Sequence, residues 1–190
     1  MGKVVVSQFM TIDGVVEDPG GSENLDRGGW AFDFERGPEG DKFKLDEVMA
    51  SDALLLGRKT YEGFAAAWPD RTDEAGFADK FNSMPKYVVS STLEDPEWNN
   101  SHVLGDDLSA EVNRLKDEVD GDILVNGSVQ LVHALADAGL VDEWRLMVFP
   151  VVLGQGKKLF PETGPKAPLE LTQSQAVGDG VQILVYTSKS

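Results

Sequence analysis

The chain has 190 residues, 41% of them hydrophobic, and a formal net charge of −16 that arises from 33 acidic and 17 basic residues. This length fits one domain, residues 1–190, that buries roughly two-thirds of the surface its unfolded chain exposes. The acidic charge disfavours nucleic acid and anionic membranes as partners. The lack of cysteine excludes disulfides and thiolate chemistry. Because the sequence opens without a cleavable leader and no apolar run reaches the ~18 residues of a membrane helix, we expect a cytoplasmic protein.

The first half of the chain predicts strands that alternate with helices. Residues 3–12 are rich in β-branched residues and end at an Asp-Gly turn. Residues 17–40 form a long loop with embedded aromatic residues, and loops of this length are usually functional. Residues 41–50 have the apolar period of a helix. The continuous apolar run 53–56 is typical of a strand that is buried on both faces, and a helix follows residue 60.

The second half continues the alternation and ends in a hairpin. Strands are expected at 86–90, 102–104, 123–125 and 143–151, and helices at 110–119 and 129–138. Two final strands, 169–177 and 180–187, are joined by a Gly-Asp turn. The pattern predicts an α/β fold with a mostly parallel central sheet and an antiparallel C-terminal hairpin.

Two junctions between a strand and a helix carry the main chemical signal. Gly57 and Gly127 each follow a buried strand and precede a helix. Backbone N–H groups at a helix N-terminus attract phosphate, and glycine lets the backbone approach a ligand closely. Each glycine alone is more often a simple turn. Together with the hydroxyl groups that end strand 86–90, they favour a nucleotide site.

Several sequence blocks, in order, resemble the dihydrofolate reductase superfamily, and within it the reductase domain of riboflavin biosynthesis. They are SQFMTIDG at 7–14, DALLLGRKTY at 52–61, KYVVSS at 86–91, ILVNGS at 123–128, VDEW at 141–144 and FPVVLGQGKKLF at 149–160. The resemblance spans nearly the whole chain. It implies a three-layer fold with helices on both faces of the sheet, and hydride transfer from NADPH.

The resemblance also implies which residues bind the cofactor. The phosphates would meet Gly57, Arg58, Lys59 and Thr60. The adenosine ribose and its 2′-phosphate would meet Ser90 and Ser91, with Arg58 reaching the same group, which favours NADPH over NADH. The pyrophosphate would meet Asn126, Gly127 and Ser128, although dihydrofolate reductases have a run of glycines at this turn. The nicotinamide amide would lie against the backbone around Gln8, Phe9 and Val16.

The proton donor is expected to be a partly buried carboxyl group with a raised pKa. Dihydrofolate reductases carry such an acid on the helix before the Gly-Arg turn, and Asp41 lies at the matching spacing from Gly57. Asp41 is also a good candidate for the N-cap of helix 41–50. Asp13 is a second candidate acid, although an Asp-Gly pair is above all a turn.

Two classes of function fit these observations. The first is an NADPH-dependent reductase of a pterin- or pyrimidine-like heterocycle. The alternative is a family member that binds a nucleotide or ligand without turnover. No metal site is expected, because His102 and His133 lie far apart without a carboxylate cluster. Four aromatic residues either line a heterocycle pocket or belong to the core: Trp30, Phe32, Phe64 and Trp68.

The substrate and the partners are less well defined by the sequence. Loop 17–40 does not match the substrate loop of dihydrofolate reductase, and Arg71 is the one obvious base that could hold a ribose phosphate. A homodimer is expected, because strands 145–149 and 181–186 have apolar side chains on more faces than a small core needs. Alternatively, these strands are central and are buried by the chain's own helices.

Overall fold

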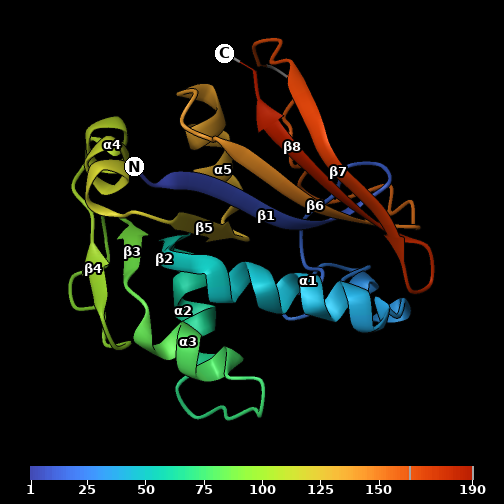
Figure 1. Cartoon of the computed structure of the whole chain (residues 1–190), viewed down its shortest axis with the longest axis horizontal. Coiled ribbons are helices and arrows are strands. Elements are labelled where there is room, and N and C mark those ends of the chain that lie inside the picture. Colours follow the sequence, from blue (N-terminus) through green and yellow to red (C-terminus); the bar gives the residue numbers. More distant parts are fainter. Residues whose placement is uncertain (163, 190) are drawn as a thin grey trace.

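The computed structural model describes residues 1–162 and 164–189, and its strands form one eight-stranded sheet (Figure 1). The strands are β1 (Lys3–Thr11), β2 (Ser51–Gly57), β3 (Lys86–Val89), β4 (Ser101–Val103), β5 (Asp122–Asn126), β6 (Glu143–Phe149), β7 (Leu169–Val177) and β8 (Val181–Ser188). The helices are η1 (Trp30–Asp33), α1 (Gly37–Ala50), α2 (Arg58–Ala67), α3 (Phe77–Ser83), α4 (Leu108–Glu118) and α5 (Val129–Asp137).

The sheet has the order β4-β3-β2-β5-β1-β6-β8-β7. All neighbours from β4 to β6 are parallel, whereas β8 pairs antiparallel with both β6 and β7. The predicted α/β fold with a mostly parallel sheet and a C-terminal hairpin is therefore confirmed. Because β2, β5 and β1 are neighbours, the turns that follow them meet at one edge of the sheet.

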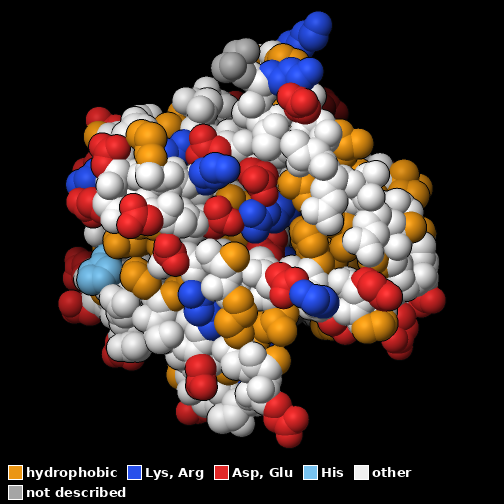
Figure 2. Space-filling model, in the orientation of Figure 1, with side chains coloured by type: hydrophobic (Ala, Val, Ile, Leu, Met, Phe, Trp, Pro, Cys, Tyr) orange, Lys and Arg blue, Asp and Glu red, His pale blue; other side chains and the backbone are white. Residues whose placement is uncertain are grey.

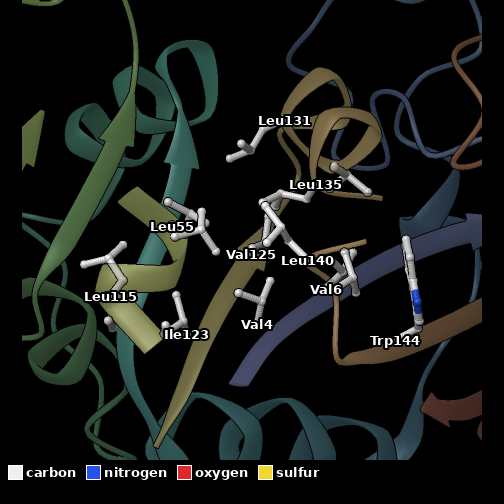
Figure 3. Close-up of a cluster of buried hydrophobic side chains, with 14 of the residues drawn as sticks. Val4, Val6, Leu55, Leu115, Ile123, Val125, Leu131, Leu135, Leu140 and Trp144 are labelled. Atoms are coloured by element: carbon white, nitrogen blue, oxygen red, sulfur yellow. The ribbon is translucent and has the colours of Figure 1, made fainter. Parts of the chain in front are cut away.

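Helices cover both faces of the parallel part of the sheet, which gives the expected three layers. On one face, Val48 of α1, Tyr61 of α2 and Phe81 of α3 pack in one cluster against the sheet. On the other face, α4 and α5 pack against β1, β2 and β5 (Figure 3). No helix in residues 1–162 and 164–189 is long and apolar enough to cross a membrane.

The antiparallel end of the sheet is covered by the long loop after β1, which contains η1, and by Phe43 of α1. Trp30 is buried there and packs against Phe149 with ring centroids 5.6 Å apart. Asp18 is also buried, and its carboxylate accepts hydrogen bonds from the backbone N–H groups of Glu23 and Leu25. The loop is therefore held by hydrogen bonds and forms part of the core.

Three elements differ from the sequence expectation. Helix α1 begins at Gly37, four residues before the expected start, because Pro38 is tolerated in the first turn of a helix. Helix α3 was not expected; its first turn is held by Asp73, which accepts from the N–H groups of Phe77 and Ala78. Strand β6 ends at Phe149 because Pro150 cannot donate to the ladder.

Strands β6 and β8 are not the exposed edge that the dimer expectation assumed. Met147 and Phe149 of β6 and Ile183 of β8 are buried against the chain's own loop and sheet. The edge strand is β7, whose residues 170–176 are exposed. The alternative, in which these strands are central, is the one that the structure has.

Candidate active site

The two glycine-bearing junctions lie side by side and are hydrogen-bonded to each other. The Gly57 N–H at the end of β2 donates to Oγ of Ser128, 2.9 Å away. The Ser128 N–H in turn donates to Oγ1 of Thr60 in the first turn of α2, at 3.0 Å. The N-termini of α2 and α5 therefore open at the same place, as a phosphate site requires.

Gly127 lets the two junctions approach each other this closely. Its φ is +54°, and a Cβ at this position would lie only 3.0 Å from Oγ1 of Thr60. Its carbonyl oxygen accepts a hydrogen bond of 2.7 Å from Nε2 of Gln8 on β1. One glycine therefore achieves here the close approach for which the resemblance implied several.

Most of the expected cofactor residues gather at this edge. Strand β1, the junction of β2 with α2 and the junction of β5 with α5 bring six of them together: Gln8, Gly57, Thr60, Asn126, Gly127 and Ser128. We call these six residues the junction site. They offer backbone, amide and hydroxyl groups but no ionised side chain.

The basic and hydroxyl residues expected at the 2′-phosphate lie at the rim of the junction site. Gly57 pairs with Val89 in the register of β2 and β3, and Arg58 and Ser90 are the next residues after this pair. Arg58 is partly exposed and makes two hydrogen bonds, of 2.9 and 3.0 Å, to the carboxylate of Glu62. Oγ of Ser90 accepts from the N–H groups of two following residues, whereas Ser91 and Lys59 are exposed. A phosphate would compete with Glu62 for Arg58.

Phe9 and Val16 differ in what they offer a nicotinamide. The half-buried ring of Phe9 meets Phe149 edge to face, with the Arg36 guanidinium 5.3 Å and the Lys44 ammonium 5.4 Å from its centroid. The N–H of Val16 already donates to the carbonyl of Lys157, at 2.9 Å.

Asp41 lies inside helix α1, so the interpretation as a helix cap is wrong. The helix begins four residues earlier, and the cap position is Arg36. The side chain of Asp41 is 65% exposed and forms an ion pair of 2.8 Å with Arg36. Asp41 therefore lacks the partial burial that was expected of the proton donor, because solvent reaches its carboxylate freely.

Asp13 shapes the turn after β1. Its carboxylate accepts hydrogen bonds from Oγ1 of Thr11 and from the N–H groups of Leu153 and Gly154. The Thr11 hydroxyl, followed by these N–H groups, outweighs the effect of burial and lowers the pKa of Asp13 to about 2. A group that is ionised over the neutral range and bonded in this way is a clamp for the turn rather than a proton donor.

The aromatic residues that were considered for a pocket are mostly core. Trp30 packs on Phe149, and Trp68 stacks on Phe81 of α3 with the ring centroids 4.8 Å apart. Phe64 also meets Phe81 and Trp68 edge to face. Phe32 is exposed.

A charged cluster on the sheet-facing side of α1 was not predicted. The carboxylate of Glu47 is 1% exposed, and its Oε1 accepts from Oγ of Ser7 at 2.8 Å and from Nζ of Lys44. Lys44 also donates to Oγ of Ser7, at 2.7 Å. We call Ser7, Lys44 and Glu47 the α1 cluster. Ser7 lies 37 residues before Lys44, and Glu47 lies three residues after it. In the sequence, the polar residues of α1 look like those of a solvent-exposed helix face.

Arg145 of β6 lies next to the α1 cluster and joins it to further carboxylates. Its guanidinium pairs with Asp122 at 2.8 Å and with Glu143 at 2.6 Å, and lies 3.9 Å from Oε2 of Glu47. Burial lowers the pKa of Arg145, but the hydrogen bonds and charges of Glu143 and Asp122 outweigh burial and raise it.

Figure 2 shows that acidic side chains are spread widely over the face of the molecule seen in Figure 1, with basic ones between them.

The chain has a relative in sequence and solved structures of similar fold. It is 29% identical to the uncharacterized protein YyaP of Bacillus subtilis (strain 168) over 97% of this chain and 94% of that protein. A structure from Shewanella sp. PV-4, provisionally named as a riboflavin biosynthesis protein, matches with a TM-score of 0.78 at 20% identity, over 99% of both chains.

A dihydrofolate reductase has the same fold. The enzyme from Enterococcus faecalis, in complex with NADP(H), matches with a TM-score of 0.62 at 16% identity, over 99% of this chain and 97% of that one. The family model of the RibD C-terminal domain matches residues 2–183. These matches confirm the resemblance that was noted in the sequence, and the chain belongs to the RibD C-terminal domain family.

Proposed function

We propose that the chain is an NADPH-dependent reductase that transfers a hydride to a small heterocycle of pterin-like or pyrimidine-like structure. The observation that carries the proposal is the junction site, where two helix N-termini and Gln8 of β1 meet through the hydrogen bonds of Gln8, Gly57 and Ser128. Membership of the RibD C-terminal domain family supports a reductase role in general.

NADPH is the proposed cofactor because two helix N-termini and one partly exposed cation, Arg58, lie along the same sheet edge. The first turns of α2 and α5, which begin at the junction site, suit a pyrophosphate, and Arg58 together with Ser90 suits a 2′-phosphate. Arg58 is free to change partners, because its present bond to Glu62 is an exposed ion pair of small stability. The dihydrofolate reductase of similar fold is in complex with NADP(H).

The junction site also fits the alternative, a protein that binds the nucleotide without turnover. The two functions differ in one observable. Binding of NADPH supports both, whereas oxidation of NADPH by a heterocycle supports the reductase alone.

The proposal is tested by titrating the protein with NADPH and NADH and then screening heterocycles for NADPH oxidation. We expect NADPH to bind at least ten-fold more tightly, and at least one pterin-like or pyrimidine-like compound to be reduced. Equal affinities would remove the NADPH assignment. Tight binding without oxidation across the panel would favour the binding protein.

Asp41 remains the proposed proton donor, with its exposed carboxylate paired to Arg36. If it delivers the proton, Asp41→Asn slows turnover by roughly 100-fold while the affinity for NADPH is unchanged. Turnover at the rate of the unaltered protein would show that another group supplies the proton.

We also propose that the protein is a homodimer and place its interface at the exposed edge strand β7. Light scattering at micromolar concentration measures this directly. A mass near twice the single-chain 20.6 kDa is expected, and a mass near 20.6 kDa would contradict the dimer.

A further inference from the structure

Asn126 and Gly127 form the one Asn-Gly pair of the chain, and they lie inside the junction site. The other five asparagines all precede a residue with a side chain: Asn24, Asn82, Asn99, Asn100 and Asn113. Asparagine is a thermally labile residue, and the residue that follows it decides how easily the next backbone nitrogen reaches its side chain. The Asn-Gly pair is therefore the position at which we expect an asparagine of this chain to react.

The backbone nitrogen of Gly127 is the nucleophile that this position offers. Glycine has no Cβ that would crowd the nitrogen as it approaches the Asn126 side chain. Both residues are half-buried, so water reaches the turn. Asn126 is the last residue of β5 and makes the last register pair with β1, whereas Gly127 has left the strand with a φ of +54°. Rotation of the Asn126 main chain toward ring closure therefore disturbs no later strand pair.

The side-chain amide of Asn126 is not held in place, unlike that of three other asparagines. Asn82, Asn99 and Asn100 each donate from Nδ2 to a backbone carbonyl, at 3.0, 3.0 and 3.1 Å. Within the part of the chain that the structure describes, the amide of Asn126 has no hydrogen-bond partner. It is therefore free to turn toward the Gly127 nitrogen.

Ser128 polarises the peptide group that contains the nucleophile. Its Oγ donates to the main-chain carbonyl oxygen of Asn126 at 3.1 Å, and the same Oγ accepts from the Gly57 N–H at 2.9 Å. The Asn126 carbonyl and the Gly127 nitrogen belong to one peptide bond, over which electrons are delocalised. Hydrogen bonds in series to the oxygen stabilise the negative charge that the group carries when the nitrogen loses its proton. Ser128 therefore favours formation of the nucleophile.

We propose that Asn126 is a site of self-catalysed deamidation that gradually disables the junction site. The Gly127 nitrogen loses its proton and bonds to Cγ of Asn126, and the bond between Cγ and Nδ2 breaks. Nδ2 leaves as ammonia and carries away that proton. Water then opens the five-membered imide at either of its carbonyl carbons and leaves aspartate or isoaspartate at position 126. One water is consumed and one ammonia is released, without an oxidant or a reductant.

The product has a carboxylate where the junction site otherwise has no ionised side chain. The amide of Asn126 offers two hydrogen-bond donors, whereas a carboxylate only accepts. A negative charge also repels a pyrophosphate, and Arg58 at the rim is already paired with Glu62. We therefore expect the deamidated protein to bind NADPH roughly ten-fold or more weakly. This consequence rests on the proposed function, whereas the deamidation itself does not.

The experiment incubates the full-length protein without cofactor in mildly alkaline buffer and follows each asparagine by mass spectrometry of its peptides. We expect Asn126 to gain about one dalton at least ten-fold faster than Asn100, with isoaspartate among the products. Asn100 is the control within the chain, because it is exposed and precedes the small residue Ser101, but its amide is bonded to the carbonyl of Ser83. The chain unfolded in urea serves as the reference for an unconstrained Asn-Gly pair.

Two variants test the chemistry. Asn126→Gln keeps the amide but must close a six-membered ring, so the mass gain at this position should stop. Ser128→Ala removes the hydroxyl from the Asn126 carbonyl and should slow the mass gain at least three-fold. A merely structural role of Ser128 would have the opposite effect, because a looser turn closes the ring more easily.

The effect on the cofactor is tested with a matched pair of variants. Asn126→Asp reproduces the aspartate product, and Asn126→Gln changes the length of the side chain without adding charge. Asn126→Asp should bind NADPH roughly ten-fold more weakly than Asn126→Gln, and saturating NADPH should slow the mass gain of the unaltered protein.

Two outcomes would overturn the proposal: a mass gain at Asn126 no faster than at Asn100, or an unchanged Asn126 in the folded protein after the unfolded chain has reacted. A faster mass gain in Ser128→Ala would overturn the role of Ser128. Failure of NADPH to bind to the unaltered protein would overturn the reductase, and it would leave the mass measurement without cofactor unaffected.

Discussion

The junction site and the α1 cluster are neighbours on the same strand, yet they are polar in different ways. The junction site uses neutral groups, and Gln8, Gly57 and Ser128 are linked by ordinary hydrogen bonds. The α1 cluster uses a partly buried ammonium and a buried carboxylate. A neutral cradle can accept a dianion without a fixed counter-charge, even in a chain of net charge −16. A buried ion pair costs free energy of desolvation, and only a close, hydrogen-bonded arrangement of the two charges repays that cost.

This difference predicts that the largest loss of stability follows from breaking the α1 cluster. Glu47→Ala leaves Lys44 and Arg145 with less compensation in a buried place, so the free energy of unfolding should fall by about 3 kcal/mol or more. Glu62→Ala removes the carboxylate of an exposed pair and should cost at most about 0.5 kcal/mol. Urea denaturation of both variants measures these two losses of the free energy of unfolding. Similar losses would show that the cluster is not effectively buried.

The rim of the junction site should show the next largest effect, on cofactor choice. Arg58→Ala removes a charge-assisted contact to the 2′-phosphate worth about 1.5–3 kcal/mol, so most of the preference for NADPH over NADH should be lost. Arg114→Ala is the matched control, because Arg114 also pairs with a glutamate four residues on, but from α4. An unaltered preference in Arg58→Ala would place the 2′-phosphate elsewhere.

A smaller effect is expected inside the junction site, where backbone geometry replaces charge. Gly127→Ala puts a side chain at φ +54°, which costs roughly 1–2 kcal/mol, and also crowds Thr60. Gly139→Ala has a similar φ of +65° with nothing within 4 Å of the added Cβ. Gly127→Ala should therefore be the less stable variant in thermal unfolding, and it alone should weaken NADPH binding. Equal behaviour of the two would contradict the close approach to Thr60.

The smallest effect concerns Asp13, which clamps the turn at the end of β1. Because its folded pKa of about 2 lies below the ordinary 3.8, its contribution to stability is complete above pH 3.8 and is lost as the pH falls towards 2. Water screens this partly exposed group, so Asp13→Asn should cost only about 0.5–1 kcal/mol at pH 7. Urea titrations from pH 7 to 2 should show the difference between the two proteins shrinking below pH 4. A constant difference would mean that the charge of Asp13 is not involved.

The contrast between the two regions also explains what could be predicted from the sequence. The junction site rests on short local patterns, a strand followed by Gly57 or Gly127 and a helix, and the parallel sheet then brings the patterns together. The α1 cluster has no local pattern. Ser7 lies within an apolar strand, and Lys44 and Glu47 lie on a helix rich in exposed charges, so only the packing of α1 on β1 brings them together.

The boundaries of helices were likewise hard to predict from local sequence patterns. The start of α1 was placed at Asp41 because an acidic residue is a common N-cap, whereas the Gly-Pro pair at 37–38 begins the helix. Helix α3 has only seven residues, too few for a clear period, and it depends on Asp73 and on packing of Phe81 against α2. These features depend on tertiary contacts that no local window contains.

The most direct test of the account is a crystal structure of the protein with NADPH. The account predicts that the pyrophosphate lies within hydrogen-bond distance of the junction site, with the 2′-phosphate on Arg58 and the nicotinamide on the side of Phe9. NADPH in the surface hollow lined by Tyr61, Pro69 and Trp98, with the junction site vacant, would contradict it.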